Sequence, residues 1–426
     1  MAEPQHMDNC NGAIQAWNFR PNETVMTKNL LGIRGVLEYV MSHMRPDGKS
    51  RIPLGHGDPS QFECFRTSAG AEQALIESIK SAKFNGYSPA AGLPATRRVL
   101  ADYLSQGFSY KLDVDDVYLT VGATQAIEIA LTVLGREGAN VLLPRPGFPY
   151  YEAVLAFKGI EGRYYDLVPE RDWEIDLGQV EAIADSNTVA MVIINPSNPC
   201  GIVFSHDNLS KLAETARRLG LLIISDEAYA HIVFGEKPFV PMGCFGSIVP
   251  VLTLGSISKR WMVPGWRVGW LTICDPNCIL RKTQIVEGIK NLVNVTCDPS
   301  TIAQAAVPQI LARTTEAFYK KMLHTLSHVA QILYNRIQKL DLLYCPSKPQ
   351  GSMFVMVKIN SSGFEDINDD IEFCALLAKE ESVIVLPGSS LGMKNWVRMT
   401  FAVDPSLLEE ALDRIESFCK RHTKNA

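Results

Sequence analysis

This chain has no long apolar run, no cluster of basic residues, no internal repeat and no low-complexity tract. A membrane-spanning helix needs roughly 20 consecutive apolar residues, so we expect no membrane span. Lysine and arginine number 41 against 46 acidic residues, a net charge of −5, and this balance argues against a nucleic-acid-binding protein. The first 15 residues lack both the basic and the apolar part of a secretory signal, which predicts a cytoplasmic protein.

Cysteine clusters and metal-binding patterns are also missing. The ten cysteines are scattered, and the one close pair, Cys274 and Cys278, has no histidine nearby in sequence. In a cytoplasmic protein we expect free thiols rather than disulfides. His324 and His328 stand four residues apart on a predicted helix, but no acidic partner accompanies them, and we predict no metal site. No GxGxxG lies between a strand and a helix, which argues against a nicotinamide-dependent dehydrogenase.

The 426 residues are 46% hydrophobic and 20% charged, a balance typical of a globular protein with two or three domains. From about residue 70 to 320, predicted strands alternate with helical segments. This alternation indicates an α/β fold, in which a mostly parallel sheet is wrapped by helices. From about residue 325 a long helix leads into a smaller α+β unit.

One lysine, Lys259, stands in the most informative stretch, which reads GSISKRWMVPGWRVG over residues 255–269. This stretch follows an apolar strand. A lysine at such a place suits a covalent bond to the carbon of a phosphorylated aldehyde. Ser256, Ser258 and Arg267 are suited to bind the phosphate. The alternative is a surface Ser-Lys loop, and the attached PGWRVG segment argues against it.

A buried carboxylate is predicted next to this lysine. The apolar run 221–225 reads as a fully buried strand, and Asp226 stands at its carboxyl end, where open α/β sheets bind ligands. A carboxylate there can pair with a protonated pyridine nitrogen, which keeps the ring an electron sink. Tyr229 is placed to hydrogen-bond the 3-oxygen of the ring. The alternative for Asp226 is a helix N-cap.

Two turns complete the set. NPSNPCG, residues 195–201, follows a second buried strand and marks a rigid turn, from which Asn198 offers a fixed amide donor. GATQ, residues 122–125, opens a helix whose free N–H groups attract phosphate, with Thr124 adding a hydroxyl. The second pattern fits an ordinary N-cap equally well.

Six segments taken together resemble the fold-type-I pyridoxal-phosphate aminotransferases. Within that superfamily they resemble the tyrosine aminotransferase group, especially its plant branch, over about residues 17 to 420. The segments are GATQ (122–125), PRPGFPYY (144–151), NPSNPCG (195–201), SDEAY (225–229), GSISKRWMVPGWRVGW (255–270) and NWVRMTFA (395–402).

The resemblance implies pyridoxal 5'-phosphate as the cofactor and assigns its contacts. Lys259 would bond to the cofactor and then act as the base, Asp226 would pair with the pyridine nitrogen, and Tyr229 and Asn198 would contact the 3-oxygen. The phosphate would be held by Ala123, Thr124, Ser256, Ser258 and Arg267. Tyr87 matches a tyrosine that reaches the phosphate of the other subunit, which implies a homodimer with active sites at the subunit interface.

The resemblance also assigns substrate contacts. Arg398, together with Asn198, would bind the α-carboxylate of the substrate. Gly57 matches a loop that closes on that carboxylate. Phe148 takes the place of the aromatic residue that stacks on the cofactor ring, where the superfamily usually has tyrosine. From the residues alone, Arg398 fits equally a strand-edge arginine in a surface ion pair, and Phe148 fits an ordinary core residue.

From the resemblance we expect a seven-stranded, mostly parallel sheet in the larger domain. We expect a flexible arm over 1–16, a segment 17–69 that belongs to the smaller domain, a cofactor-binding domain over 70–325 and a smaller domain over 326–426. The implied reaction moves the amino group of tyrosine, or another aromatic amino acid, to a 2-oxo acid such as 2-oxoglutarate. The alternatives are a C–S lyase acting on cysteine conjugates and a nicotianamine aminotransferase.

Overall fold

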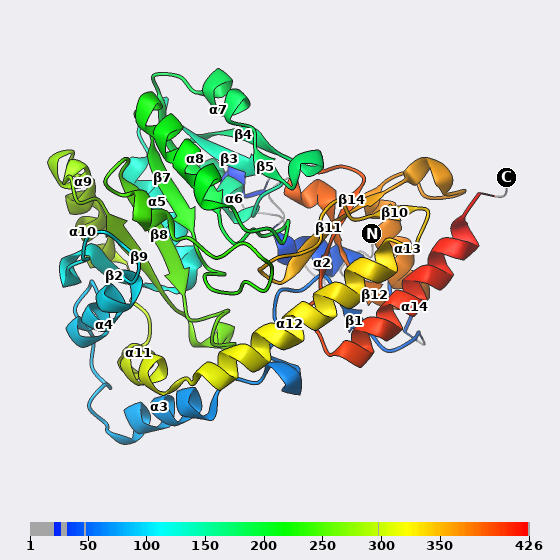
Figure 1. Cartoon of the computed structure of the whole chain (residues 1–426), viewed down its shortest axis with the longest axis horizontal. Coiled ribbons are helices and arrows are strands. Elements are labelled where there is room, and N and C mark those ends of the chain that lie inside the picture. Colours follow the sequence, from blue (N-terminus) through cyan, green and yellow to red (C-terminus); the bar gives the residue numbers. More distant parts are fainter. Residues whose placement is uncertain (1–20, 27–31, 47, 297, 425–426) are drawn as a thin grey trace, which may run out of the picture.

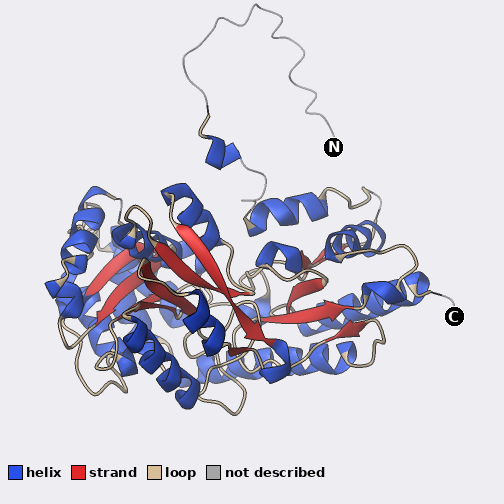
Figure 2. Cartoon of the chain, turned by 90° about the horizontal axis from the view of Figure 1, so that it is seen from above, coloured by secondary structure: helices blue, strands red, loops and turns tan. Residues whose placement is uncertain are grey.

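The structure, a computed structural model, describes residues 21–26, 32–46, 48–296 and 298–424. The arm predicted over 1–16 lies outside these residues. Two bodies of secondary structure lie side by side, one around a large sheet and one around smaller sheets, and the long helix α12 (Glu316–Ile337) runs from the first to the second (Figure 1). Seen from above, helices surround the strands in both bodies (Figure 2).

The large sheet confirms the predicted α/β architecture. Its strand order is β2-β9-β8-β7-β6-β3-β4-β5, and the pairs among β8, β7, β6, β3 and β4 are parallel. It has eight strands where seven were expected, because the two-residue strand β5 adds to one edge. The strands are β2 (Val117–Val121), β3 (Asn140–Arg145), β4 (Glu161–Val168), β5 (Glu174–Ile175), β6 (Thr188–Ile194), β7 (Leu222–Asp226), β8 (Val251–Ser256) and β9 (Val268–Cys274).

Two hydrophobic cores lie on the two faces of this sheet, because neighbouring side chains of a strand point to opposite faces. Along β6, Val192 and Ile194 belong to one core, while Met191 and Ile193 belong to the other. Burial on both faces explains why these strands read as continuous apolar runs. Helices α5 (Gly122–Leu134), α6 (Tyr150–Lys158), α9 (Ile279–Lys282) and α10 (Ile285–Val295) cover one face, and α4 (Pro94–Leu104), α7 (Leu177–Ile183) and α8 (His206–Leu219) cover the other.

The smaller body brings the two ends of the described chain together. An antiparallel sheet has the order β10-β11-β14-β13, and β1 near the N-terminus pairs in parallel with β12. The strands are β1 (Ile52–Pro53), β10 (Leu343–Tyr344), β11 (Phe354–Ile359), β12 (Val383–Ile384), β13 (Leu386–Pro387) and β14 (Trp396–Thr400). Helices α2 (Ile33–Met41), α13 (Asp370–Glu381) and α14 (Pro405–His422) pack in this body. Helices α3 (Ala69–Lys80) and α11 (Thr301–Arg313) pack on each other, α11 also contacts α4, and α1 (Glu23–Met26) contacts α6. The domain boundaries proposed from the sequence stay a prediction.

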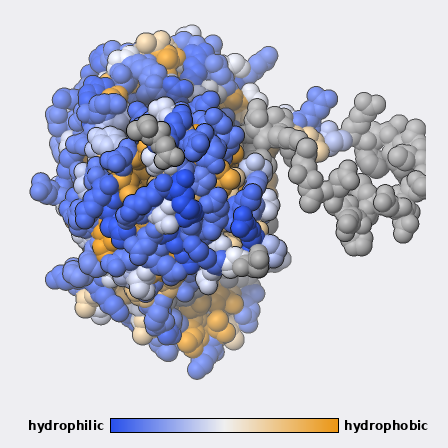
Figure 3. All heavy atoms as spheres, turned by 90° about the vertical axis from the view of Figure 1, so that its right-hand side faces the viewer, coloured by the Kyte–Doolittle hydropathy of each residue, from blue (hydrophilic) through white to orange (hydrophobic). Residues whose placement is uncertain are grey.

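The face of the molecule drawn in Figure 3, seen from the side of the smaller body, is largely hydrophilic. Apolar residues gather near the lower edge of this view. Within the described residues, no helix combines the length and the apolar character that crossing a membrane requires.

Candidate active site

Three of the predicted site residues, Asn198, Asp226 and Lys259, stand at or just beyond the carboxyl ends of three neighbouring parallel strands. In the sheet register, Ile194 of β6 pairs with Asp226 of β7, and Asp226 pairs with Leu254 of β8. The turn that carries Asn198 and the loop that carries Lys259 therefore start at the same edge of the sheet. This edge is where open α/β sheets bind ligands.

Lys259 follows β8 and is partly buried. Its Nζ donates a hydrogen bond of 2.5 Å to the carbonyl oxygen of Gly57 and lies 5.8 Å from the centre of the Tyr229 ring. Burial lowers the pKa of Lys259 to about 8, and the positive charges of Arg398 and Arg267 act in the same direction, while Asp58 opposes them. A lysine with this pKa is partly neutral near neutral pH, as attack on an aldehyde carbon requires.

Arg398 is an interior residue rather than a surface one, so the strand-edge alternative is wrong. Its strand β14 lies between β11 and β13, and the side chain is only 2% exposed. Nη1 donates to Asn198 Oδ1 at 3.1 Å, Nη2 donates to the Gly55 carbonyl oxygen at 2.9 Å, and Nε has no partner. Within the described part of the chain, both groups that accept hydrogen bonds from Arg398 are uncharged. A buried cation with neutral partners is costly without an anion, so the site favours an incoming carboxylate.

The residues predicted to bind phosphate lie around the start of helix α5. Arg267 Nη2 lies 3.3 Å from Thr124 Oγ1. A Cβ atom on Gly122 would lie 2.2 Å from this Nη2, so the guanidinium reaches the helix only because residue 122 is glycine. Likewise, a Cβ on Gly269 would lie 2.7 Å from the backbone nitrogen of Ala123.

Two further hydroxyls lie at the end of β8 and just beyond it. Ser256 and Ser258 are buried, and the Ser258 N–H donates to Ser256 Oγ at 3.3 Å. Helix α5 has 13 residues, and no side chain caps its N-terminus. A guanidinium, hydroxyl groups and the N-terminus of a helix together form a donor set that fits a phosphate group.

Asp226 is the last residue of β7, and no helix begins after it, so the N-cap alternative is wrong. Its Oδ1 accepts the Ala228 N–H at 3.1 Å, and its Oδ2 accepts the Tyr151 hydroxyl at 3.1 Å. Burial raises the pKa of Asp226 to about 6, while both hydrogen bonds lower it. A positively charged group placed opposite would hold this carboxylate in its ionised form.

Tyr151 is a residue of this site that the sequence argument missed. It is fully buried in the first turn of α6, and its ring meets that of Phe148 edge to face, with centroids 6.5 Å apart. The available signal was its position three residues after Phe148, close to the start of α6.

Phe354 of β11 was also missed. The guanidinium carbon of Arg398 lies 4.2 Å from the centre of its ring, which also meets the Tyr229 ring edge to face at 5.8 Å. A Cβ on Gly57 would lie 2.7 Å from Phe354, so only glycine lets that loop approach the ring. No signal in the sequence pointed to it, because an apolar residue in a strand carries no sign of its contacts.

Tyr87 is fully exposed in the single chain. Its predicted role in the phosphate site of a second subunit remains a prediction.

Replacing Tyr151 with phenylalanine is expected to make binding of the predicted cofactor, pyridoxal phosphate, more sensitive to acid. Binding that uses the ionised Asp226 weakens as pH falls through the pKa of that carboxyl. The substitution removes a hydrogen bond that lowers this pKa, so the loss should move to higher pH. A bond to a charged group is worth about 1.5 kcal/mol, which corresponds to roughly one pH unit. The dissociation constant of the cofactor, measured between about pH 5 and 8, would show the shift.

Tyr165→Phe is the matched control. Tyr165 is equally buried, but its hydroxyl donates to the Val192 carbonyl oxygen at 2.6 Å and does not contact Asp226. This variant should leave the pH profile in place. An equal shift in both variants would mean that the hydrogen bond to Asp226 is not responsible.

Comparison with known proteins is consistent with this geometry. Residues 49–415 match the family described as aminotransferase class I and II. The chain is 56% identical over 373 residues to nicotianamine aminotransferase 1 of Oryza sativa subsp. japonica, covering 88% of this chain and 76% of the relative. It is 47% identical to the S-alkyl-thiohydroximate lyase of Arabidopsis thaliana, covering 97% of this chain and 90% of that protein. The crystal structure of tyrosine aminotransferase from Leishmania infantum superposes with a TM-score of 0.89 at 35% identity, covering 96% of this chain and all of that one.

Proposed function

This chain belongs to the aminotransferase class I and II family, and we propose that it transfers the amino group of tyrosine, or another aromatic amino acid, to a 2-oxo acid such as 2-oxoglutarate. The product from tyrosine is 4-hydroxyphenylpyruvate. The observation that carries the proposal is a lysine, Lys259, whose burial lowers its pKa to about 8 and which lies near enough to Arg398 and Arg267 for their charges to act in the same direction. The likeness to a tyrosine aminotransferase structure supports the choice of donor.

Pyridoxal phosphate, when bound, supplies an aldehyde carbon and an aromatic ring that takes up electrons from the α-carbon of the donor. Ala123, Thr124, Ser256, Ser258 and Arg267 would hold its phosphate at the start of α5. Asp226 would keep a proton on the ring nitrogen, and Tyr151 would orient that carboxylate. Phe148 would stack on the ring, while Tyr229 and Asn198 would contact the 3-oxygen.

The remaining residues act on the donor. Arg398 binds the α-carboxylate with two parallel N–H groups, and the Gly57 loop covers it. Lys259, when neutral, would accept the α-proton of the donor at Nζ and hold it there for the return transfer. The second half of the reaction runs the same proton transfers backward with the 2-oxo acid.

We also propose that the active form is a cytoplasmic homodimer. Tyr87 is fully exposed in one chain, and its predicted role requires the phosphate site of the other subunit. The division at residues 17–69, 70–325 and 326–426 belongs to the same proposal. It is supported by the pairing of β1 with β12, which joins the N-terminal segment to the C-terminal body.

The reaction is tested by mixing the cofactor-loaded protein with an equal amount of tyrosine and no 2-oxo acid. The absorbance band of the lysine-linked cofactor should convert to that of pyridoxamine phosphate, with an equal amount of 4-hydroxyphenylpyruvate formed. An unchanged band with tyrosine, phenylalanine and tryptophan would contradict the aromatic donor.

Two alternatives are read from the same experiment, because similar proteins are named for them. Conversion by nicotianamine but not by tyrosine would identify a nicotianamine aminotransferase. Release of pyruvate and ammonia from a cysteine conjugate, with no 2-oxo acid present, would identify a C–S lyase.

A further inference from the structure

A three-residue loop, Gly55 to Gly57, connects two cations of the candidate active site. The Gly55 carbonyl oxygen accepts a hydrogen bond from Arg398 Nη2 at 2.9 Å, and the Gly57 carbonyl oxygen accepts one from Lys259 Nζ at 2.5 Å. His56 stands between these two carbonyl groups in the chain. Its imidazole is therefore carried by a piece of backbone that both cations hold.

Close packing on both sides of His56 keeps this loop in place. A Cβ atom on Gly55 would lie 2.5 Å from the side chain of Leu37, and a Cβ on Gly57 would lie 2.7 Å from that of Phe354. Only glycine fits at either position. The backbone that carries the imidazole is thus fixed by packing as well as by its hydrogen bonds.

The imidazole of His56 has hydrogen-bonding capacity that the described part of the chain leaves unused. Its Nδ1 is buried, and among the described residues it has no hydrogen-bond partner. A buried polar atom without a partner is costly, so this nitrogen favours a ligand that can pair with it. The side chain as a whole is partly exposed, so it can exchange a proton with water.

Three charged side chains act on this imidazole. Burial lowers the pKa of His56, the positive charges of Arg51 and Arg398 lower it further, and Asp58 raises it. Lys259 holds the other end of the loop and is cationic below its own pKa of about 8. An anion bound at Arg398 would offset the positive charge near His56, and the imidazole would then hold its proton more tightly.

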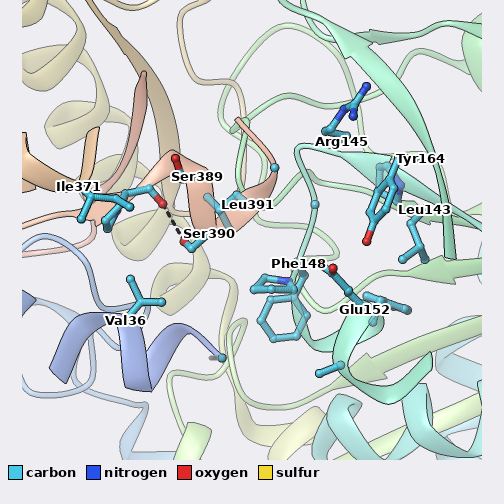
Figure 4. A pocket seen from close by; sticks show the side chains of 18 of the residues that line it. Val36, Leu143, Arg145, Phe148, Glu152, Tyr164, Ile371, Ser389, Ser390 and Leu391 are labelled. Atoms are coloured by element: carbon cyan, nitrogen blue, oxygen red, sulfur yellow. Dashed lines mark hydrogen bonds between the residues drawn. The ribbon is translucent and has the colours of Figure 1, made fainter. Parts of the chain in front are cut away.

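The neighbouring cleft is a poorer place for such an anion. It has a volume of about 660 Å³ and opens between the two bodies (Figure 4). Arg145 is the one cationic side chain among the described residues that line it, and it already donates two hydrogen bonds to Asp166, at 2.6 and 3.0 Å. The acid Glu152 also lines the cleft. Arg398, whose hydrogen-bond partners are uncharged, is the stronger site for a carboxylate.

We propose that His56 is a further residue of the carboxylate site, and that it takes up one proton from water when a substrate carboxylate binds at Arg398. Neutral imidazole and a proton become imidazolium, and no other bond forms or breaks in this step. Both ring nitrogens of the imidazolium are donors, so its buried Nδ1 can donate to the carboxylate. This inference rests on the proposed function and adds a residue that makes carboxylate binding depend on pH.

The direction of the pH effect follows from the charges. The pKa of His56 is lower in the free protein than with a carboxylate bound. Binding therefore strengthens as pH falls through the pKa of the bound form, and the gain is complete below the pKa of the free form. For a difference of roughly one pKa unit, the dissociation constant changes about 10-fold in total.

The test uses 3-(4-hydroxyphenyl)propanoate, a carboxylate with no amino group to transfer, and the cofactor-loaded protein. Its dissociation constant, measured between about pH 5.5 and 8, should fall about 10-fold toward the acid end. NMR of protein labelled at the histidine ring carbons follows His56 directly. Saturating probe should raise the pKa of His56 by roughly one unit.

His56→Asn places an amide near the position of Nδ1 but cannot take up a proton. This variant should lose the change in affinity below about pH 7, and its missing NMR signal identifies His56. Any change left near pH 8 belongs to Lys259. His206→Asn is the matched control, because His206 is exposed at the start of α8, and the profile should stay in place.

Arg51→Gln guards against a disturbance of the loop by His56→Asn. Arg51 is exposed, and its charge lowers the pKa of His56. Without that charge the pKa of His56 should rise in the free and in the bound protein, so the change in affinity should move to higher pH but keep its size.

A profile that His56→Asn leaves unchanged, or a His56 pKa that the probe does not move, would overturn the proposal. Absence of probe binding at every pH would overturn it as well, because Arg398 would then not bind carboxylates. Failure of the proposed function looks different, because the unsubstituted protein would then leave tyrosine unconverted whether or not the probe binds.

Discussion

Replacing Lys259 with alanine is expected to lower the rate of the tyrosine half-reaction by at least about 10⁴-fold, because in the proposed mechanism the variant loses both the covalent anchor of the cofactor and the base that takes the α-proton. No second amine within the described site is placed to replace it. Its neighbours Arg398 and Arg267 are guanidinium groups, which stay protonated and cannot act as bases. Single-turnover absorbance with tyrosine measures the rate.

Three controls separate loss of the base from loss of the cofactor. The phosphate and ring contacts remain, so the variant should still bind pyridoxal phosphate, with the spectrum of the free aldehyde. Added methylamine should restore part of the rate, because a small amine can enter and take the proton. Lys83→Ala removes an exposed lysine and should leave the rate unchanged. A Lys259→Ala variant within 10-fold of the unsubstituted rate would remove Lys259 from the mechanism.

Replacing Asp226 with asparagine should give the second largest loss, about 10³-fold in kcat. The ring takes up electrons from the α-carbon only while its nitrogen is protonated, and a buried carboxylate is what holds that proton. Asparagine fills nearly the same space but carries no charge. Burial raises the pKa of Asp226 to about 6, so the carboxyl is mostly ionised at neutral pH even before a positive group faces it.

Glu227→Gln is the matched control for this prediction, because it removes the charge of a neighbouring buried carboxyl group. Glu227 is the next residue, is also buried, and has a pKa raised to about 7 by burial. Its Oε1 accepts hydrogen bonds from the Ser225 hydroxyl at 2.9 Å and the Met242 N–H at 2.8 Å, away from Tyr151. The rate should change by a few-fold at most. A loss of similar size in both variants would point to general disturbance of the strand end rather than to the charge of Asp226.

Much of the fold was predictable because it follows from local patterns. Apolar runs such as Thr188–Ile194 form strands buried on both faces. In a parallel sheet the carboxyl ends of all strands lie at one edge, so the polar turns that follow the strands lie there whatever the strand order. Strand β7 was predicted one residue too early, since Asp226 continues the extended backbone before the chain turns. Strand β5 was missed because two residues carry no periodic signal.

The contacts of Arg398 could not be predicted from local pattern. The sequence places this arginine in a strand but leaves an edge position and an interior one equally open. Pairing with β11 on one side and β13 on the other decides the question, and both partners are set by the packing of the whole smaller body. The same holds for Phe354 and Tyr151, whose roles depend on neighbours far away in the chain.

By itself, then, the sequence determined the α/β architecture and the likeness to the aminotransferase family. It also singled out Lys259, Asp226 and Arg267, whose chemical roles stay predictions. These depend on residue type and short spacing, which the chain carries locally. Only the tertiary structure decided that Arg398 is buried beside Asn198, that Tyr151 bonds to Asp226, and that a cleft opens between the two bodies. Those features depend on side chains distant in sequence, and packing the two bodies together is what brings them into contact.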